Sequence, residues 1–203
     1  MAKEKKLTQA QLKKLQEEFQ KLPPEKKAEL VEKQCLFCQI AQGKIESTKV
    51  YEDSDVIAIL DIIPASPGHT LVIPKRHYQF FFQIPPSTLG RISEVAAKIS
   101  TILIDTVKAH GLNLHAANGT VAGQRVPHFH LHLIPRFEDD GISFEWQGQK
   151  VEKKDLEKIA KQVSEKLKQD KMTAHENEKA EKSKQAEESD EMRFLRRKLD
   201  RIP

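Results

Sequence analysis

The chain has 203 residues and a formal net charge of +4, with 38% hydrophobic and 32% charged residues. This length allows one well-packed core with appendages, and the charged fraction indicates that part of the chain is solvated. The charge is too small to indicate nucleic-acid binding, the two cysteines cannot build a disulfide framework, and no apolar run reaches the length of a membrane span or a signal-peptide core. We therefore expect a soluble, cytoplasmic protein.

Residues 1–34 are predicted to form a helical extension. Large apolar residues recur at helical spacing between positions 12 and 22, and Pro23-Pro24 must end that helix. A second short helix is expected over 25–33. The apolar stripe of this hairpin is too narrow for it to be stable alone. The extension is therefore either a frayed, charged appendage or a lid or dimer brace that packs on the core.

Cys35 and Cys38 form a C-x-x-C motif that opens the domain proper, directly before a short helix expected over 39–42. This motif admits three interpretations, which are reduced structural thiols, a redox pair or half of a zinc site. A zinc site needs two more ligands, and the spacing alone does not show where they are.

Three strands joined by short turns are predicted next, around residue 50, over 56–60 and over 69–73. Asp61 stands at the end of the second strand, before a turn that contains proline and glycine. Because the connections are short, we expect these strands to form an antiparallel meander.

A long amphipathic helix is predicted after the meander, with Ser87 or Thr88 as its cap and Gly111 as its end. A fourth strand over 112–117 and a glycine-bounded loop over 118–123 follow. The helix thus provides the crossover from the meander to the last two strands.

The segment from Gly123 to Arg136, GQRVPHFHLHLIPR, carries the strongest pattern in the chain. Histidine alternates with large apolar residues over 128–133, and alternate side chains of a strand point to opposite faces. The pattern therefore predicts a fifth strand, ended by Pro135, with three imidazoles on one face. Neighbouring imidazoles would lie roughly 7 Å apart, so the array favours neutral rings held by hydrogen bonds or a metal.

These elements predict an α+β domain over 35–147, with an antiparallel five-stranded sheet, a long crossover helix on one face and residues 142–146 closing the core. The face that carries the histidines is expected to stay open for a ligand. A C-terminal helix is expected over 148–168, and a solvated linker with a short basic amphipathic tail over 169–203. The tail could dock on the domain, bring basic groups to a phosphate-rich ligand or be inert.

The polar residues around the histidine strand suit phosphate chemistry. Imidazole can act as a nucleophile toward phosphorus, and its free pKa of about 6.5 leaves it largely neutral at cellular pH. A flanking histidine can orient the ring or handle the proton. The loop over 118–126 offers backbone N–H groups and the Gln124 amide to a charged phosphoryl oxygen, and an acid such as Asp61 suits ribose hydroxyls. Together these residues indicate a phosphate-ester or nucleotide site.

The sequence over 123–136 resembles the histidine-triad (HIT) signature, and the similarity extends over about 35–146. Pro127 and the segment Phe144-Glu145-Trp146 are most similar to the branch that hydrolyses dinucleoside polyphosphates, the fragile-histidine-triad-like branch. The resemblance implies a HIT-like α+β fold, binding of a purine nucleotide or dinucleoside polyphosphate, and a homodimer with a continuous sheet.

The resemblance also implies roles for individual residues. Histidine-triad enzymes attack the α-phosphate with the middle histidine and form a nucleotidyl-imidazole that water then breaks. His130 matches this nucleophile, and His132 matches the histidine that supports it by hydrogen bonding near the phosphate. The nucleotide-binding positions of the family match Asp61 for the ribose, Ile62 for the base or sugar, His69 beside the active site, and Asn118 and Gln124 on the phosphate side.

Zinc-containing members of the family use a C-x-x-C motif, a histidine after the third strand and the first triad histidine. The matching positions here are Cys35, Cys38, His77 and His128. The resemblance therefore implies a closed, tetrahedral structural zinc site. The competing interpretation is a pair of reduced buried thiols, with His128 hydrogen-bonded inside the nucleotide site.

Two positions depart from the family pattern. Ala117 stands where Asn or Gln often contacts phosphate, although Asn118 is adjacent, and Arg125 replaces a small hydroxyl residue. Arg125 could make a charge-assisted phosphate contact or point into solvent. The resemblance therefore leaves the leaving group open.

The leading functional hypothesis is a nucleotide hydrolase or transferase that acts on a purine nucleotide conjugate such as a diadenosine polyphosphate. A nucleoside phosphoramidase, which would use the same nucleophile on a P–N bond, is the runner-up. A non-catalytic nucleotide-binding regulatory protein, whose helical termini engage a partner, is the alternative from another class. Nucleic-acid binding through the basic tail is a weaker hypothesis, because it requires a steep salt dependence.

Overall fold

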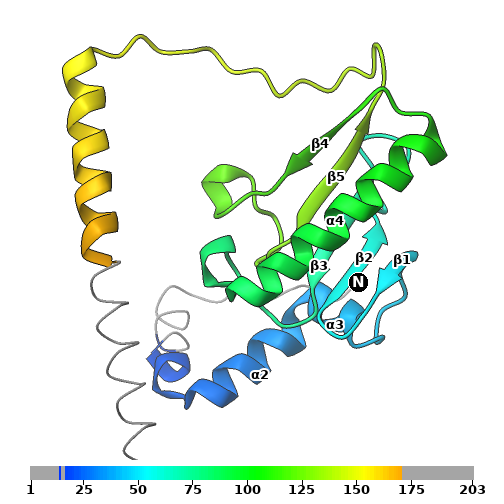
Figure 1. Cartoon of the computed structure of the whole chain (residues 1–203). Helices are drawn as coiled ribbons and strands as arrows, with labels where there is room; N and C mark the ends of the chain where they lie inside the picture. Colours follow the sequence, from blue (N-terminus) through cyan, green and yellow to red (C-terminus); the bar gives the residue numbers. More distant parts are fainter. Residues whose placement is uncertain (1–13, 15–16, 171–203) are drawn as a thin grey trace, which may run out of the picture. The chain divides into compact units, whose positions relative to one another are not determined.

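The computed structural model describes Lys14 and residues 17–170 (Figure 1). It contains two compact units, Met1–Ser143 and Phe144–Pro203. The first turns of the predicted N-terminal helix, and the linker and basic tail predicted beyond residue 170, lie outside the described residues. None of the described helices is both long and apolar enough to cross a membrane.

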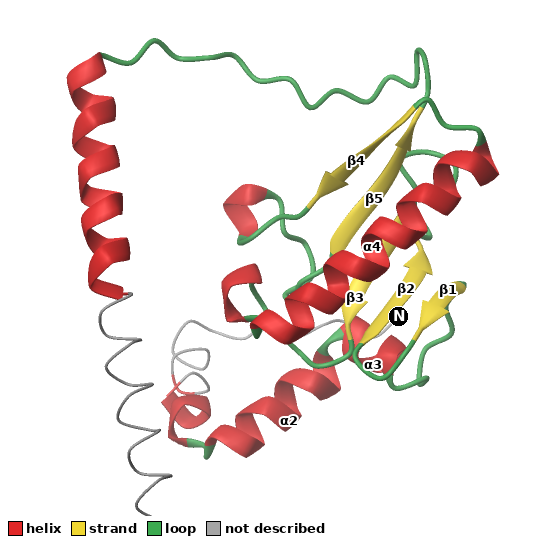
Figure 2. Cartoon of the chain, viewed as in Figure 1, coloured by secondary structure: helices red, strands yellow, loops and turns green. Residues whose placement is uncertain are grey.

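The first unit contains one sheet and several helices, not all of which pack on it (Figure 2). Its five strands are all paired antiparallel, in the order β1-β2-β3-β5-β4. This arrangement confirms the predicted α+β fold. In chain order the elements are α2 (Pro24–Gln34), α3 (Leu36–Ala41), β1 (Lys49–Glu52), β2 (Val56–Leu60), β3 (Thr70–Pro74), η1 (Phe81–Gln83), α4 (Pro86–Val107), β4 (Gly111–His115), η2 (Thr120–Ala122) and β5 (Leu131–Arg136).

β2 and β3 are covered on both faces, as their continuous apolar sequences favour. Figure 1 shows the long helix α4 lying across one face of the sheet. The core cluster on the α4 face contains Val56, Ala58, Val72, Ile84, Ile92, Val95, Ala96, Ile99, Leu103, Phe129 and Leu133. The cluster on the opposite face, which we call the α3 face, contains Cys35, Phe37, Cys38, Ile40, Ile57, Ile59, Leu71 and Ile73.

The second cluster corrects the prediction that the histidine face of the sheet is open. His132 pairs with Leu71 across β3 and β5, so the two side chains share a face. Leu71 belongs to the cluster that α3 covers. Phe37 and Ile40 of α3 are both buried there, because a six-residue helix this apolar must lie on the sheet to remove its side chains from water. The sheet face that carries the histidines is therefore open to a ligand only where α3 does not cover it.

The predicted ends of the long helix were wrong. α4 begins at Pro86, one residue before Ser87, because a proline at the first helical position loses no intrahelical hydrogen bond. It ends at Val107, where Lys108 takes up the left-handed conformation with φ 56°. Gly111, which was predicted to end the helix, instead begins β4.

The fifth strand also differs from its prediction. β5 begins at Leu131, so two of the alternating histidines precede it. The Phe129 N–H donates to the Tyr78 carbonyl oxygen at 2.6 Å instead of extending the ladder with β3. Pro135 lies inside β5 and does not end it. It pairs with Leu112 of β4 and lies beyond the paired part of β3, where the Ser66 hydroxyl donates to the Pro135 carbonyl oxygen at 2.5 Å.

The second unit contains a helix over residues 153–170, which begins five residues later and ends two residues later than the C-terminal helix predicted over 148–168. Trp146, predicted to close the core, is 86% exposed. It belongs to this second unit and not to the sheet domain. The apolar stripe of the helix is exposed at Leu156, Ile159, Val163 and Leu167.

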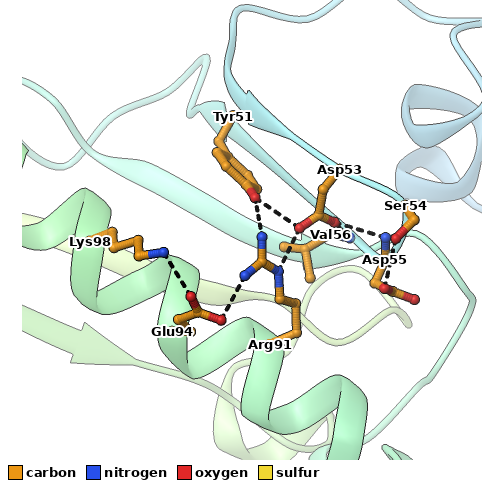
Figure 3. A network of polar contacts seen from close by, with 8 residues as sticks. All are labelled: Tyr51, Asp53, Ser54, Asp55, Val56, Arg91, Glu94 and Lys98. Atoms are coloured by element: carbon orange, nitrogen blue, oxygen red, sulfur yellow. Dashed lines mark hydrogen bonds and ion pairs between the residues drawn. The ribbon is translucent and has the colours of Figure 1, made fainter.

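A polar network fastens α4 to the turn between β1 and β2 (Figure 3). Arg91 of α4 donates from Nε to Asp53 Oδ2 at 2.7 Å and also contacts the Tyr51 hydroxyl. The other carboxylate oxygen of Asp53 accepts the Val56 and Asp55 N–H groups at 2.7 and 2.8 Å. Burial raises the pKa of Asp53, but the Arg91 guanidinium and these two amides outweigh it and hold the pKa well below its ordinary range.

We predict that Asp53→Ala lowers the free energy of unfolding at pH 7 by about 1–3 kcal/mol, because it leaves the Arg91 guanidinium and two turn amides without their acceptor. Since the folded-state pKa is depressed, this contribution is present above the ordinary value of 3.8 and is lost as the pH falls below it. Urea unfolding at pH 7 and pH 3 measures both effects. Glu94→Ala, at the exposed end of the same network, is the matched control and should change stability much less.

Candidate functional site

His130 is held so that one of its two ring nitrogens is fixed as a donor. Its Nδ1 lies 2.8 Å from the carbonyl oxygen of His128. A carbonyl oxygen can only accept, so Nδ1 carries the proton and the neutral ring keeps its lone pair on Nε2. Burial lowers the pKa of His130, which favours this neutral ring. The geometry therefore presents Nε2 as a base or nucleophile.

His132 belongs to a chain of hydrogen bonds that fixes two further rings. The Ala65 N–H donates to His69 Nδ1 at 3.0 Å, so the neutral His69 ring carries its proton on Nε2. That Nε2 lies 2.9 Å from His132 Nδ1 and donates to it. His132 then carries its own proton on Nε2, and its ring centroid lies 4.7 Å from that of His130. The acceptor nitrogen Nε2 of His130 and the donor nitrogen Nε2 of His132 therefore belong to neighbouring rings.

Neutral rings are favoured along this chain. Burial lowers the pKa of His69. Burial, together with repulsion from His130 and His69, lowers the pKa of His132 to about 4. These shifts favour neutral rings of His69 and His132 near pH 7.

Asp61 lies beside this histidine chain at the end of β2. Its Oδ1 accepts the Ile63 N–H at 2.9 Å, and its Oδ2 lies 3.6 Å from His69 Nδ1. The possible metal-ligating atoms of Asp61, His69 and His132 all lie within 4.8 Å of one another. A cation there would have to displace the hydrogen bonds on both nitrogens of His69, so these three residues are better explained as a hydrogen-bonded relay.

Apolar surface is exposed next to Asp61. Ile62 and Ile63 are 89% and 83% exposed. Ile62 also lines a surface hollow of about 560 Å³, together with Gly43 and residues 45–49. A carboxylate beside exposed apolar side chains suits a ligand with hydroxyl groups and a flat apolar ring.

The loop over 118–124 is braced by its own amide side chains. Gln124 is buried, and it accepts the Gly119 N–H at 2.7 Å and donates to the Gln79 carbonyl oxygen at 2.7 Å. Asn118 accepts the Phe81 N–H at 2.7 Å. Both side chains were predicted to face phosphate, and in the structure both hold the loop against the segment over 79–81.

The four residues predicted as zinc ligands meet in one buried cluster. Cys35 Sγ lies 3.3 Å from His128 Nδ1, Cys38 Sγ lies 3.3 Å from His77 Nδ1, and the second sulfur is also 3.5 Å from His128 Nδ1. All four ligand atoms lie within 4.8 Å of one another. We call Cys35, Cys38, His77 and His128 the Cys/His cluster.

The donor chemistry of the Cys/His cluster fits zinc. A tetrahedral zinc with Zn–S of about 2.3 Å and Zn–N of about 2.0–2.1 Å separates its ligand atoms by roughly 3.3–3.8 Å, close to the distances found here. His128 donates from Nε2 to the Pro74 carbonyl oxygen at 2.9 Å, which leaves the Nδ1 lone pair facing the sulfurs. A hydrogen bond from the Cys38 thiol lowers the pKa of Cys35, which favours a thiolate. These residues could hold the metal without rearrangement of the ring of His128.

Two neighbours of the site were missed by reasoning from the sequence. The ring of Phe37, between the two cysteines, stands edge-on to His130 at 5.0 Å and to His128 at 5.9 Å. His115 of β4 pairs directly with His132, with ring centroids 5.8 Å apart. Neither has a spacing signal in the sequence, because each depends on which elements pack together.

Known proteins resemble this chain over the sheet domain. An uncharacterized HIT-like protein of Mycoplasma genitalium is 42% identical over 131 residues, which cover 64% of this chain and 92% of that protein. The adenosine 5′-monophosphoramidase HNT1 of Candida albicans is 35% identical over 141 residues, 67% of this chain and 90% of that protein. The adenylylsulfatase HINT3 of Arabidopsis thaliana is 36% identical over 130 residues, 64% of each.

Solved structures agree with this similarity. A HIT family protein from Bacillus anthracis has a TM-score of 0.62 and 42% identity, and the match covers 66% of this chain and 96% of that one. A zinc-bound histidine triad family protein from Mycobacterium smegmatis has a TM-score of 0.53 and 36% identity, covering 58% of this chain and 86% of that one. Residues 42–139 match the model of the HIT domain. With its histidines, sheet and relatives all in agreement, this chain belongs to the HIT family.

Proposed function

We propose that this protein is a nucleotide hydrolase or transferase that cleaves at the α-phosphate of a purine nucleotide conjugate, with His130 as the nucleophile. The observation that carries this proposal is the hydrogen bond from His130 Nδ1 to the His128 carbonyl oxygen. It leaves an unprotonated Nε2 at neutral pH. Attack by Nε2 forms the P–N bond, and the leaving group departs with the electron pair of its bond to phosphorus. Water then attacks the same phosphorus and breaks the P–N bond, which restores His130.

His128 and His132 support the two steps in different ways. When Nε2 of His130 bonds to phosphorus the ring becomes cationic, and the His128 carbonyl oxygen stabilises the Nδ1–H that remains. His132 Nε2–H, fixed as a donor by His69, supports the phosphate or the leaving-group oxygen by hydrogen bonding. The pair thus combines a nucleophile with a neighbouring proton donor.

The nucleoside is proposed to bind beside Asp61. The carboxylate accepts hydrogen bonds from ribose hydroxyls, and Ile62 packs on the base or sugar from its exposed position at the rim of the hollow. His69 acts through its hydrogen bond to His132. Asn118 and Gln124 contribute on the phosphate side by holding the loop over 118–124 in shape.

The candidate substrates differ in the group that leaves when the bond to the α-phosphate is broken. A diadenosine polyphosphate remains the first candidate, from the likeness of the sequence around Pro127 to the branch that hydrolyses dinucleoside polyphosphates. A phosphoramidate is the second, and it is favoured by the adenosine 5′-monophosphoramidase among the relatives. The adenylylsulfatase name adds a third leaving group on the same adenylyl moiety. We infer that the adenylyl α-phosphate is the shared element.

We further propose a structural zinc in the Cys/His cluster and a homodimer. The zinc is supported by the ligand distances and by the zinc-bound relative.

The dimer is supported by the edge position of β4 in the sheet, and by Leu114 of β4 and Ile102 of α4, which are 62% and 64% exposed. A second copy adding its own β4 would extend the sheet across the two chains.

For zinc, we expect about one ion for each purified chain and a lower melting temperature after treatment with a chelator, with recovery when zinc is added back. At a free zinc concentration about 100 times its Kd, binding to the folded state contributes about 2.7 kcal/mol. Cys38→Ser should abolish both the metal content and the response to the chelator. Metal analysis and thermal melts provide the measurement, and a metal-free chain with an unchanged melting temperature would contradict the zinc site.

For pH, we expect stability to fall as the pH decreases from 6.5 to about 4. The pKa of His132 is lowered from 6.5 to about 4 by burial and by its neighbouring rings, so over this window the unfolded chain binds protons that the folded chain does not. His132→Gln removes this ring. The stability lost through His132→Gln should therefore be largest near pH 7 and shrink toward pH 4. Urea unfolding across the range measures it, and a constant difference would refute the linkage.

For catalysis, we expect His130→Ala to lower AMP release by more than about 10³-fold while the fold and AMP binding persist, because the substitution removes the nucleophile and not a core side chain. Purified protein is incubated separately with diadenosine tetraphosphate and with an adenosine 5′-phosphoramidate. His110→Ala is the matched control and should retain turnover, because this exposed histidine lies directly before β4 and its N–H donates to Arg136, the last residue of β5.

Comparing the two substrates shows which of the candidate activities the protein has. Release of AMP from the polyphosphate, lost in His130→Ala, supports the first candidate. Release from the phosphoramidate alone supports the second. Binding of AMP without turnover of either substrate would make the protein a nucleotide-binding regulatory protein, and turnover by His130→Ala would overturn the mechanism.

A further inference from the structure

His128 contacts both the Cys/His cluster and the ring of His130. Its imidazole Nδ1 faces Cys35 and Cys38 of the Cys/His cluster at 3.3 and 3.5 Å. Its backbone carbonyl oxygen accepts the Nδ1–H of His130 at 2.8 Å. One residue therefore connects the metal ligands to the ring that is proposed to attack phosphorus.

The position of His128 is fixed from several directions. Its side chain is fully buried, and its Nε2 donates to the Pro74 carbonyl oxygen at 2.9 Å. Its backbone N–H donates to the Val126 carbonyl oxygen at 2.8 Å. This segment lies outside β5, so no strand ladder holds the His128 carbonyl in place. The peptide that carries this carbonyl is held by the Phe129 N–H, which donates to the Tyr78 carbonyl oxygen at 2.6 Å, and the Cys/His cluster holds the His128 ring on its Nδ1 side.

Phe37 makes a second connection between the same two groups. It stands between Cys35 and Cys38 in the chain and is 5% exposed. Its ring meets the His130 ring edge-on at 5.0 Å with an interplanar angle of 68°. Closing the two cysteines on the cluster therefore also places an aromatic wall against His130.

The tautomer of His130 depends on both connections. A neutral imidazole can carry its proton on either nitrogen, and the hydrogen bond that one nitrogen makes decides which. If the His128 carbonyl or the Phe37 ring shifts, the ring can rotate and place its proton on Nε2. A protonated Nε2 has no lone pair with which to attack phosphorus.

We propose that the Cys/His cluster positions the nucleophile, with Phe37 and His128 as the positioning residues. When the cluster is assembled, these two residues hold His130 with its proton on Nδ1 and its lone pair on Nε2. When the cluster is dismantled, that orientation is lost although the α4 face of the sheet remains folded. This inference rests on the proposed function for its catalytic consequence, but the orientation of His130 can be measured without turnover.

The test uses the full chain labelled with nitrogen-15 at histidine. Phe37→Leu keeps all four ligands and removes the aromatic wall, whereas Cys38→Ser removes a ligand. Ile40→Ala is the matched control, because it deletes buried apolar surface from the same helix without changing a ligand or a ring contact. For each protein, zinc content, the His130 tautomer from its nitrogen chemical shifts, and kcat for AMP release are measured.

We expect the wild type with zinc to show one His130 tautomer, protonated on Nδ1. Phe37→Leu should keep its zinc, show a mixture of tautomers and lose about 10- to 100-fold in kcat. Cys38→Ser and chelated wild type should show the same mixture without zinc. Ile40→Ala should lose stability but keep the wild-type tautomer.

A single Nδ1-protonated tautomer with unchanged kcat in both Phe37→Leu and the zinc-free wild type would overturn the proposal. A tautomer mixture in Ile40→Ala would overturn it as well, because loosening of α3 in general would then be sufficient. If zinc removal also exposes the amides of α4 to hydrogen exchange, Phe37→Leu with zinc bound decides the question. If AMP release is absent from every protein while the tautomer responds as expected, the positioning holds and the proposed function fails.

Discussion

The hydrogen bond between His130 Nδ1 and the His128 carbonyl oxygen is the interaction on which the proposed chemistry of this site depends. It can form because residues 128–130 leave the strand geometry before β5 begins. In a regular ladder the His128 carbonyl would be a partner of a neighbouring strand. Here the Phe129 N–H turns to the Tyr78 carbonyl oxygen, and the carbonyl of His128 becomes available to a side chain. An irregular strand entry thus converts a backbone acceptor into part of the site.

The sequence predicts regular elements well because their pairing follows side-chain periodicity. β2 was predicted with its bounds, since a run of only five apolar residues between turns is too short for a typical helix and favours a buried strand. The start of β5 was missed for the opposite reason. Alternation of histidine with apolar residues is satisfied by residues 128–130 whether or not they bond to a strand, and the competing partner, Tyr78, lies 51 positions away in the chain. Where two backbone partners compete, periodicity does not decide.

Some residues of the candidate site could be predicted from the sequence and others could not. The triad histidines and the Cys/His cluster could be assigned from their likeness to a family signature, because the expected chemistry requires those residue types. Phe37 and His115 could not, since their roles depend on how α3 and β4 meet the rest of the sheet. For Gln124 the motif and the structure give different kinds of information. Its place on the phosphate side was inferred from the motif and stays a prediction, whereas only the structure shows that its oxygen accepts the Gly119 N–H and its nitrogen donates to the Gln79 carbonyl oxygen.

The two faces of the sheet are stabilised by different means, and this explains why the proposed metal ligands and the proposed nucleophile share one face. The α4 face has a 22-residue helix, a continuous apolar cluster and the Arg91 network. The α3 face has a helix of only six residues without a side-chain cap, far below the length at which an isolated helix is stable. Burial of Phe37 and Ile40 contributes part of what holds it there. Bonds from Cys35 and Cys38 to a metal shared with His77 and His128 would supply the rest, because they would join the start of α3 to the segments that follow β3 and precede β5. A metal bound there would also act on His130, because His128 is both one of the four proposed ligands and the residue whose carbonyl oxygen accepts the His130 Nδ1–H.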